Sequence, residues 1–63
     1  MDQKPVVQLS GQDGNVFNLI SIVRRVLKEQ VSKEKAEEFT ACAMQCSSYD
    51  EVLFLIQEYV DVV

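Results

Sequence analysis

Two cysteines, Cys42 and Cys46, are the first side chains whose spacing suggests chemistry. On a helix, residues four apart lie on one face, which lets both thiols act together. However, structural zinc sites nearly always have four ligands, and the chain has 2 cysteines and no histidine. Redox pairs are typically Cys-x-x-Cys at the start of a helix, whereas this pair lies late in its predicted helix. We predict that both cysteines pack in the core without a metal or cofactor; a minor metal- or thiol-linked role is the alternative.

A loop with two glycines is the second candidate site. Gly11, Asp13, Gly14 and Asn15 lie between a predicted strand and a predicted helix, and the N-terminus of a helix attracts phosphate through its free N–H groups. No lysine follows at the spacing of a P-loop, and the third glycine of a dinucleotide-binding motif is missing. We therefore predict a structural loop, in which Asn15 or Asp13 caps the helix.

The ionisable side chains favour neither catalysis nor nucleic-acid binding. With 10 acidic and 6 basic residues, the formal net charge is −4, and histidine is absent, which excludes Ser-His-Asp and Cys-His catalysis. We predict that the protein is not an enzyme. Nucleic-acid binders normally carry a Lys/Arg footprint, so a small regulatory factor that binds nucleic acid through Arg24, Arg25 and Lys28 is the weaker alternative. The carboxylates that we interpret as a solvated surface, rather than as a metal site or an acid/base pair, are Glu34, Glu37, Glu38, Asp50, Glu51, Glu58 and Asp61.

Length and composition restrict the class of protein. A chain of 63 residues forms one domain, and 48% apolar residues is too many for a disordered chain. No run approaches the roughly 20 apolar residues that span a bilayer, and the N-terminus lacks the features of a signal peptide. We expect a cytoplasmic protein without a membrane partner, with a disordered arm over residues 1–5 and a single domain over residues 6–63.

Hydrophobic periodicity predicts a central helix over residues 16–30. Its apolar stripe is wider than that of an ordinary surface helix, so we expect other elements to cover it on more than one side. The residues of this stripe and its flanks are Val16, Phe17, Leu19, Ile20, Ile22, Val23, Val26 and Leu27.

Two shorter helices follow. Ser32 is the predicted N-cap of a helix over residues 33–46, and Ser48 and Glu51 have the spacing of a capping box, which predicts a third helix over residues 49–58. The residues that we expect these two helices to bury are Ala36, Phe39, Cys42, Ala43, Cys46, Tyr49, Val52, Leu55, Ile56 and Tyr59.

Both ends of the domain have the character of strands. Residues 6–9 and 60–63 are rich in β-branched side chains that alternate with polar ones, which is typical of short strands. We predict that the two strands pair and cover part of the helical core. The expected fold class is therefore α+β, mainly α, in the order β-α-α-α-β.

Some apolar residues fall outside the faces that a monomer can bury. Phe54 shares its side of the third helix with polar residues, and Ile22 has polar neighbours on the first. With Leu19 or Val26 nearby, they predict a patch that binds a partner or a second copy.

The chain carries a sequence pattern that resembles a family of small uncharacterised bacterial proteins. The pattern V-x-L-x-G-x-D-G-N-x-F covers residues 7–17, Ser32 begins a second helix, and Tyr49-Asp50 leads to a terminal Y-V-D-V over residues 59–62. Family members are of about this length and are often encoded near mobile or phage-like elements. The resemblance covers residues 6–63 and implies one compact α+β domain, with no activity, cofactor or catalytic residue. The departures are the cysteine-bearing second helix and the Val62-Val63 end.

Together, these patterns predict a small non-enzymatic interaction or accessory protein. Its expected partner is an unidentified protein or a second copy of the chain. The conformational entropy lost on folding costs about 1.5 kcal/mol per residue. In a chain this short, that cost nearly cancels the free energy gained by burying apolar surface. Burial of a shared apolar patch in a homodimer would add stability.

Overall fold

The computed structural model describes residues 4–11 and 14–63, so Asp13, one of the two candidate helix caps, lies outside the described residues. The described elements confirm the predicted fold class, a mainly α domain with two short strands. In chain order they are β1 (Val6–Val7), α1 (Val16–Gln30), α2 (Lys33–Met44), α3 (Tyr49–Tyr59) and β2 (Asp61–Val62).

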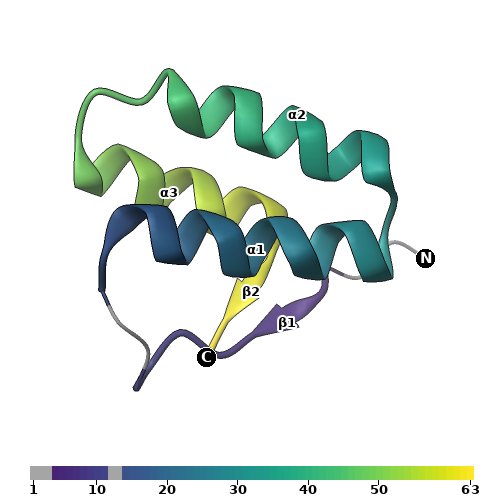
Figure 1. The fold of residues 1–63 in the computed structure, drawn as a ribbon. Coiled ribbons are helices and arrows are strands. Elements are labelled where there is room, and N and C mark those ends of the chain that lie inside the picture. The colour runs from purple at the N-terminus through teal and green to yellow at the C-terminus, as the bar shows by residue number, and fades with distance from the viewer. Residues whose placement is uncertain (1–3, 12–13) are drawn as a thin grey trace.

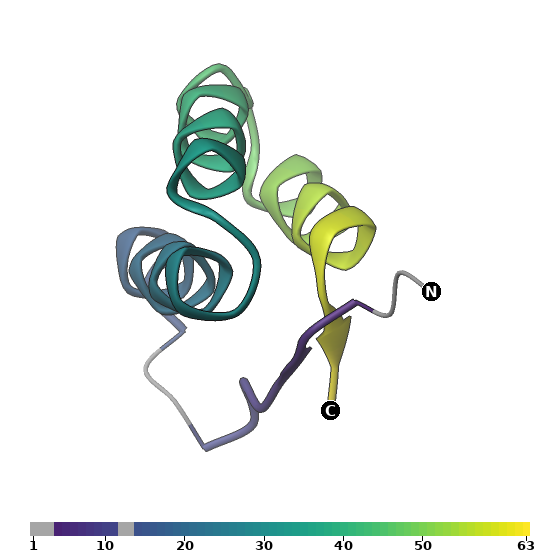
Figure 2. The same cartoon turned by 90° about the vertical axis from the view of Figure 1, so that its right-hand side faces the viewer.

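The three helices pack around one core, and the strands cover one side of it. Figure 2 looks along the helices and shows them at the corners of a triangle, with the paired strands β1 and β2 next to α3. Figure 1 shows α2 lying along α1, with the short connection between them at one end. The side chains that are most completely buried come from all three helices and from the residue before β2: Val23, Leu27, Phe39, Ile56 and Val60.

Helix α1 begins where the sequence predicts. The Asn15 side chain accepts a hydrogen bond from the Phe17 backbone N–H at 2.8 Å, which satisfies one of the unpaired donors at the helix start. The helix buries Leu19, Ile20, Val23 and Leu27, one side of the predicted stripe. Helices α2 and α3 pack against that side, and the stripe's other edges stay partly or fully exposed.

Helix α2 begins at the predicted cap but ends two residues early, at Met44. The Ser32 Oγ accepts from the Lys35 N–H at 3.0 Å. At the other end, the N–H groups of Gln45 and Cys46 donate to carbonyls three residues earlier, at 3.1 and 3.2 Å. Such bonds tighten the last turn. Cys46 therefore lies beyond the helix, and the prediction that both cysteines share one helix face is wrong.

Helix α3 has a variant of the predicted capping box. The Ser48 Oγ accepts from the Glu51 N–H at 3.2 Å, as expected. The Glu51 carboxylate accepts instead from the Ser47 N–H, at 2.8 Å, one residue before the cap. The helix buries Val52 and Ile56, whereas the Tyr49 side chain is 45% exposed, so the prediction that Tyr49 is buried is wrong.

The two strands pair in parallel, with Val6 opposite Asp61 and Val7 opposite Val62. Each is shorter than predicted; Val60 instead ends α3, its N–H donating to the Ile56 carbonyl at 2.9 Å. The Asp61 N–H donates to the Pro5 carbonyl at 2.8 Å, and the Val63 N–H to the Val7 carbonyl at 2.9 Å. The pairing confirms that the ends of the domain meet.

Two residues of the predicted N-terminal arm contact the domain. The Pro5 carbonyl takes part in the strand pairing, and the Lys4 Nζ donates to the Gln57 carbonyl at 2.9 Å. Lys4 and Pro5 thus lie against the domain that is predicted to begin at residue 6. No helix in residues 4–11 and 14–63 combines the length and apolar character needed to cross a membrane.

Candidate functional site

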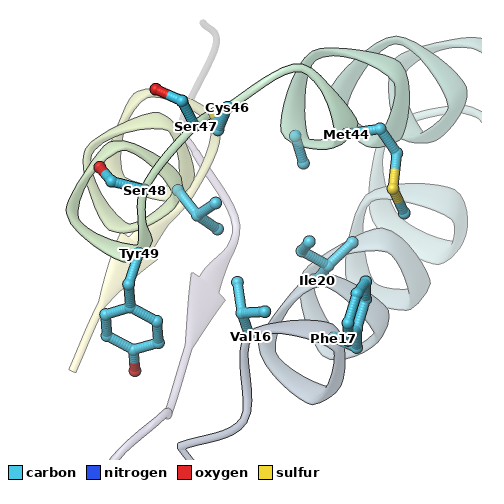
Figure 3. Close-up of a pocket in the computed structure, with 10 residues that line it drawn as sticks. Val16, Phe17, Ile20, Met44, Cys46, Ser47, Ser48 and Tyr49 are labelled. Atoms are coloured by element: carbon cyan, nitrogen blue, oxygen red, sulfur yellow. The ribbon is translucent and has the colours of Figure 1, made fainter.

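The candidate site is an apolar hollow at one end of the helices, which we call the end groove. It lies between the first turn of α1, the last turn of α2 and the first turn of α3, with the α2–α3 connection along one side (Figure 3). Its volume is about 340 Å³, at the lower end of the range of ligand pockets. Its lining residues are Val16, Phe17, Ile20, Ala43, Met44, Cys46, Ser47, Ser48, Tyr49 and Val52.

The floor of the end groove is buried and its rim is exposed, although both are apolar. Ile20 and Val52 belong to the buried core. On the rim, Phe17 is 64%, Met44 59% and Tyr49 45% exposed. Figure 3 shows Phe17 and Met44 on one side of the hollow and Tyr49 on the other. Three large apolar side chains from three helices thus surround one opening, whereas singly scattered exposed hydrophobes are normal on protein surfaces.

Helix capping fixes the positions of these rim residues. The Asn15 cap sets the first turn of α1 and therefore the direction of Phe17, and the Ser48 cap does the same for Tyr49 in α3. Gly14 lies beside Tyr49, since a Cβ at Gly14 would lie 3.7 Å from the Tyr49 hydroxyl oxygen. Of the predicted loop residues, Asn15 acts as the structural cap and Gly11 has a positive φ of 83°, a conformation that favours glycine.

Only some of the residues that are predicted to form a partner surface are exposed. Leu19 is 4% exposed, so its inclusion in an exposed patch is wrong; it belongs to the core, where its place in the α1 stripe also puts it. Ile22 and Val26 are half-buried and pack against the core. Phe54 is 70% exposed, but the hollow beside it is lined from α3 and the α2–α3 connection, with no residue of α1.

The end-groove rim was not among the predicted site residues. Phe17 lies on the flank of the predicted α1 stripe, Tyr49 is predicted to be buried, and Met44 carries no sequence signal of its own. Phe17 and Tyr49 are 32 residues apart in the chain. Their exposure depends on how the neighbouring helices lie, which the periodicity of one helix does not contain.

The cysteines differ from each other in burial. Cys42 is exposed and Cys46 is intermediate, and both are free thiols. The prediction that both pack in the core is therefore wrong for Cys42, whose side chain is exposed on α2. Cys46 packs against the core, and its Sγ donates to the Cys42 carbonyl at 3.6 Å. In the described part of the chain, no three Cys, Asp or Glu side chains gather as metal ligands.

A polar cluster joins α2 to α3 away from the end groove. The Tyr59 hydroxyl donates to the Glu38 Oε2 at 2.6 Å, and the Lys35 Nζ lies 3.3 Å from the same oxygen. The Tyr59 ring packs edge-on against Phe39, with ring centroids 5.2 Å apart. The hydrogen bond to the Glu38 carboxylate, more than burial, raises the pKa of Tyr59 above its usual range. The same bond, followed by Lys35, lowers the pKa of Glu38.

We expect the Tyr59 phenol to ionise above the usual tyrosine pKa of about 10. Because this pKa is raised in the folded state, protonated Tyr59 stabilises the fold. This contribution to the free energy of unfolding is fully present below about pH 10 and is lost as the pH rises through the folded-state pKa. The pKa shift of Glu38 has the opposite sign. Ionised Glu38 stabilises the fold above the usual glutamate pKa of about 4.3, and this stabilisation is lost as the pH falls below that pKa.

Titration of phenolate absorbance measures the Tyr59 transition, and Tyr59→Phe identifies it by removing it. In Glu38→Gln, which keeps a hydrogen-bond acceptor without the charge, the transition moves to lower pH. An unchanged Tyr59 midpoint in Glu38→Gln contradicts the assigned cause of the shift.

The predicted basic cluster lies on the surface. Arg24, Arg25 and Lys28 are all exposed on α1. Within residues 4–11 and 14–63, the ion pair that the structure contains is between Lys35 and Glu38, so the three cations form no ion pair with α2.

In comparisons with known proteins, no family model, curated protein or solved structure matches the chain.

Proposed function

We propose that this protein is a non-enzymatic interaction module that holds apolar side chains of a partner protein in the end groove. The observation that carries the proposal is the gathering of Phe17, Met44 and Tyr49, all exposed, around one hollow with a buried apolar floor. Exposed apolar patches of this kind mark interaction sites. Aromatic residues and methionine are also enriched at protein interfaces.

The lining favours binding over catalysis. The ten lining residues include no charged side chain. The Glu51 carboxylate accepts from the hydroxyl of one of them, Ser47, at 3.1 Å, but the pKa of Glu51 is lowered by its bonds to Ser47, which makes this carboxylate a weak general base. The polar side-chain groups of the end groove are those of Cys46, Ser47, Ser48 and Tyr49; the Cys46 thiol donates to the Cys42 carbonyl, and the Ser48 hydroxyl already caps α3.

A reducing compartment fits the same proposal. Both cysteines are free thiols, and disulfides form mainly in oxidising compartments. This supports the expected cytoplasmic location. The family resemblance stays a prediction; it implies no activity that would compete with a binding role.

Binding of a neutral side-chain analogue tests the groove directly. Titration of the full chain with N-acetyltryptophan amide, followed by heteronuclear NMR, is expected to shift the resonances of Ile20, Ala43 and Val52. In the double variant Phe17→Gln and Met44→Gln we expect binding about fivefold weaker or more, because each lost apolar contact of one methylene is worth about 0.8 kcal/mol. The fold should be unaffected, since both side chains are exposed.

Val63→Ser is the control, because Val63 is 63% exposed, nearly the same fraction as Phe17, and lies outside the end groove. It should bind the analogue as the unmodified protein does. Shifts that are spread over other surfaces, or that persist in the double variant, contradict the proposal.

A further inference from the structure

Strand β1 has one paired edge and one open edge. The sheet has the order β1-β2, so within residues 4–11 and 14–63 the strand has β2 on one side and no strand on the other. In Figure 1, β2 lies to the left of β1, and no helix or strand is drawn to the right of β1 beneath α1. An open sheet edge is a template for pairing with another chain.

The strand pairing identifies the backbone groups at the open edge. The hydrogen bonds to the end of the chain use alternate residues: the Pro5 carbonyl, the Val7 carbonyl and the Leu9 N–H. Backbone groups of successive strand residues point to opposite edges, so the N–H and C=O groups of Val6 and Gln8 point away from β2. Among the described residues, these groups have no hydrogen-bond partner.

The open edge also lacks the usual barriers to pairing. Proteins protect such edges with charged side chains or proline, and residues 5–11 contain no Asp, Glu, Lys or Arg. Pro5 is no barrier, because its carbonyl belongs to the paired edge and its missing N–H therefore leaves the open edge intact. The Val6 side chain, which is 60% exposed, adds apolar surface beside the unpaired groups.

We propose that β1 pairs antiparallel with β1 of a second copy of this chain. The twofold axis would pass between the two Val7 residues, so that Val6 of each copy lies opposite Gln8 of the other. Residues opposite each other in such a pair exchange both N–H···O=C bonds. Every open backbone group of Val6 and Gln8 thereby gains a partner, and the two sheets join in the order β2-β1-β1-β2.

Charge and symmetry favour a second copy as the occupant. Each copy has a formal net charge of −4, so two copies repel each other unless they meet along an uncharged surface, which residues 5–11 provide. A twofold contact uses the same surface on both copies and closes at the dimer. The outer edge of β2 offers less, because the Val60 N–H already donates to the Ile56 carbonyl at 2.9 Å and Val62 alone faces outward.

This inference is independent of the proposed function. None of residues 5–11 lines the end groove, so pairing along β1 does not use the lining of that site. The dimer would carry two end grooves. A partner with two apolar anchors would then bind more tightly than to one groove, because its second anchor binds within the same complex.

Amide hydrogen exchange at two protein concentrations tests the pairing residue by residue. At about 1 mM we expect the N–H groups of Val6 and Gln8 to exchange about threefold more slowly than at about 0.02 mM, which corresponds to a weak dimer with a dissociation constant of about 0.3 mM. The Asp61 and Val63 N–H groups, which bond within one chain, should change less. Nuclear Overhauser contacts between labelled and unlabelled copies are expected to join Val6 to Gln8.

Edge variants then test which surface forms the dimer, with sedimentation velocity as the measurement. Val6→Lys places a charge in the seam and is expected to weaken dimerisation about fivefold or more. Its matched control is Val31→Lys, since Val31 is 49% exposed and follows α1 outside both strands; this variant should dimerise as the unmodified protein does. Gln8→Pro removes one outward N–H but none of the bonds to the end of the chain, and circular dichroism checks that its helices remain.

Each outcome decides the inference. A chain that stays monomeric, with equal exchange rates at both concentrations, overturns it, as does a dimer that Val6→Lys and Gln8→Pro leave unchanged. Dimerisation that is lost only in the Phe17→Gln and Met44→Gln double variant would place the contact at the end groove and overturn it too. Protection of Val6 and Gln8 in a monomeric chain by an added extended peptide would make a partner strand the occupant instead. The analogue titration decides the proposed function separately.

Discussion

Phe39→Ala is expected to lower the free energy of unfolding by about 3–5 kcal/mol. Phe39 is 0% exposed and is the largest of the fully buried side chains in the described part of the chain. From α2 it reaches the Tyr59 ring of α3, with the two ring planes at 68°. Alanine would leave a cavity at this junction and remove the aromatic contact. The total stability of a chain of 63 residues is typically about 3–9 kcal/mol, so the variant should be largely unfolded or close to it.

Urea denaturation followed by circular dichroism measures this loss. Phe17→Ala is the matched control, because Phe17 is 64% exposed and its truncation should change stability by only about 0.5 kcal/mol. Phe39→Leu, which refills part of the cavity, should recover part of the stability. Equal losses in the Phe39→Ala and Phe17→Ala variants would contradict the position of Phe39 at the centre of the core.

Deletion of residues 61–63 is the second change with a large expected effect. It removes the hydrogen bonds from Asp61 to Pro5 and from Val63 to Val7, and the bond from the Leu9 N–H to the Val63 carbonyl. Each is worth about 0.5–1.5 kcal/mol net. The deletion also releases β1 and so exposes the Val7 side chain, which is only 4% exposed in the intact fold. The loss of this burial costs about 1.5–3 kcal/mol. We expect a loss of about 3–7 kcal/mol, comparable with the whole stability of the domain.

Hydrogen exchange and urea denaturation of the deletion variant measure that loss. The control is Val63→Ser, which keeps the backbone bonds and changes an exposed side chain. If the deletion variant unfolds at the same urea concentration as the unmodified protein, the helices are stable without the strands. The strand pairing would then contribute little to the fold.

The two destabilising changes also bear on the end groove. Its floor consists of core residues from α1, α2 and α3, so a variant that loosens the helices removes the site with the fold. Phe17, Met44 and Tyr49 are exposed, and their substitution leaves the core intact. Binding and stability are therefore separable in this protein, which is why the functional tests use rim residues and the stability tests use Phe39 and the strand pairing.

Local interactions explain what the sequence by itself determined. The start of each helix depends on a cap and on residues within one turn of it, so Asn15, Ser32 and Ser48 could be identified as caps without the fold. Apolar spacing likewise placed Val23, Leu27 and Ile56 in the core. The pairing of the chain ends followed from their β-branched residues and from the need to cover the helices, although its parallel register did not.

Contacts between distant residues were decided only by the tertiary structure. The period of a helix gives the angle between its own side chains, but not the angle at which a neighbouring helix covers it. Residues at the edge of an apolar stripe can therefore become buried or exposed, and Phe17, Tyr49 and Cys42 became exposed. The Glu38–Tyr59 hydrogen bond joins residues 21 apart, and the end groove joins the ends of three helices. The site exists because the packing leaves these helix ends apart, which no local pattern encodes.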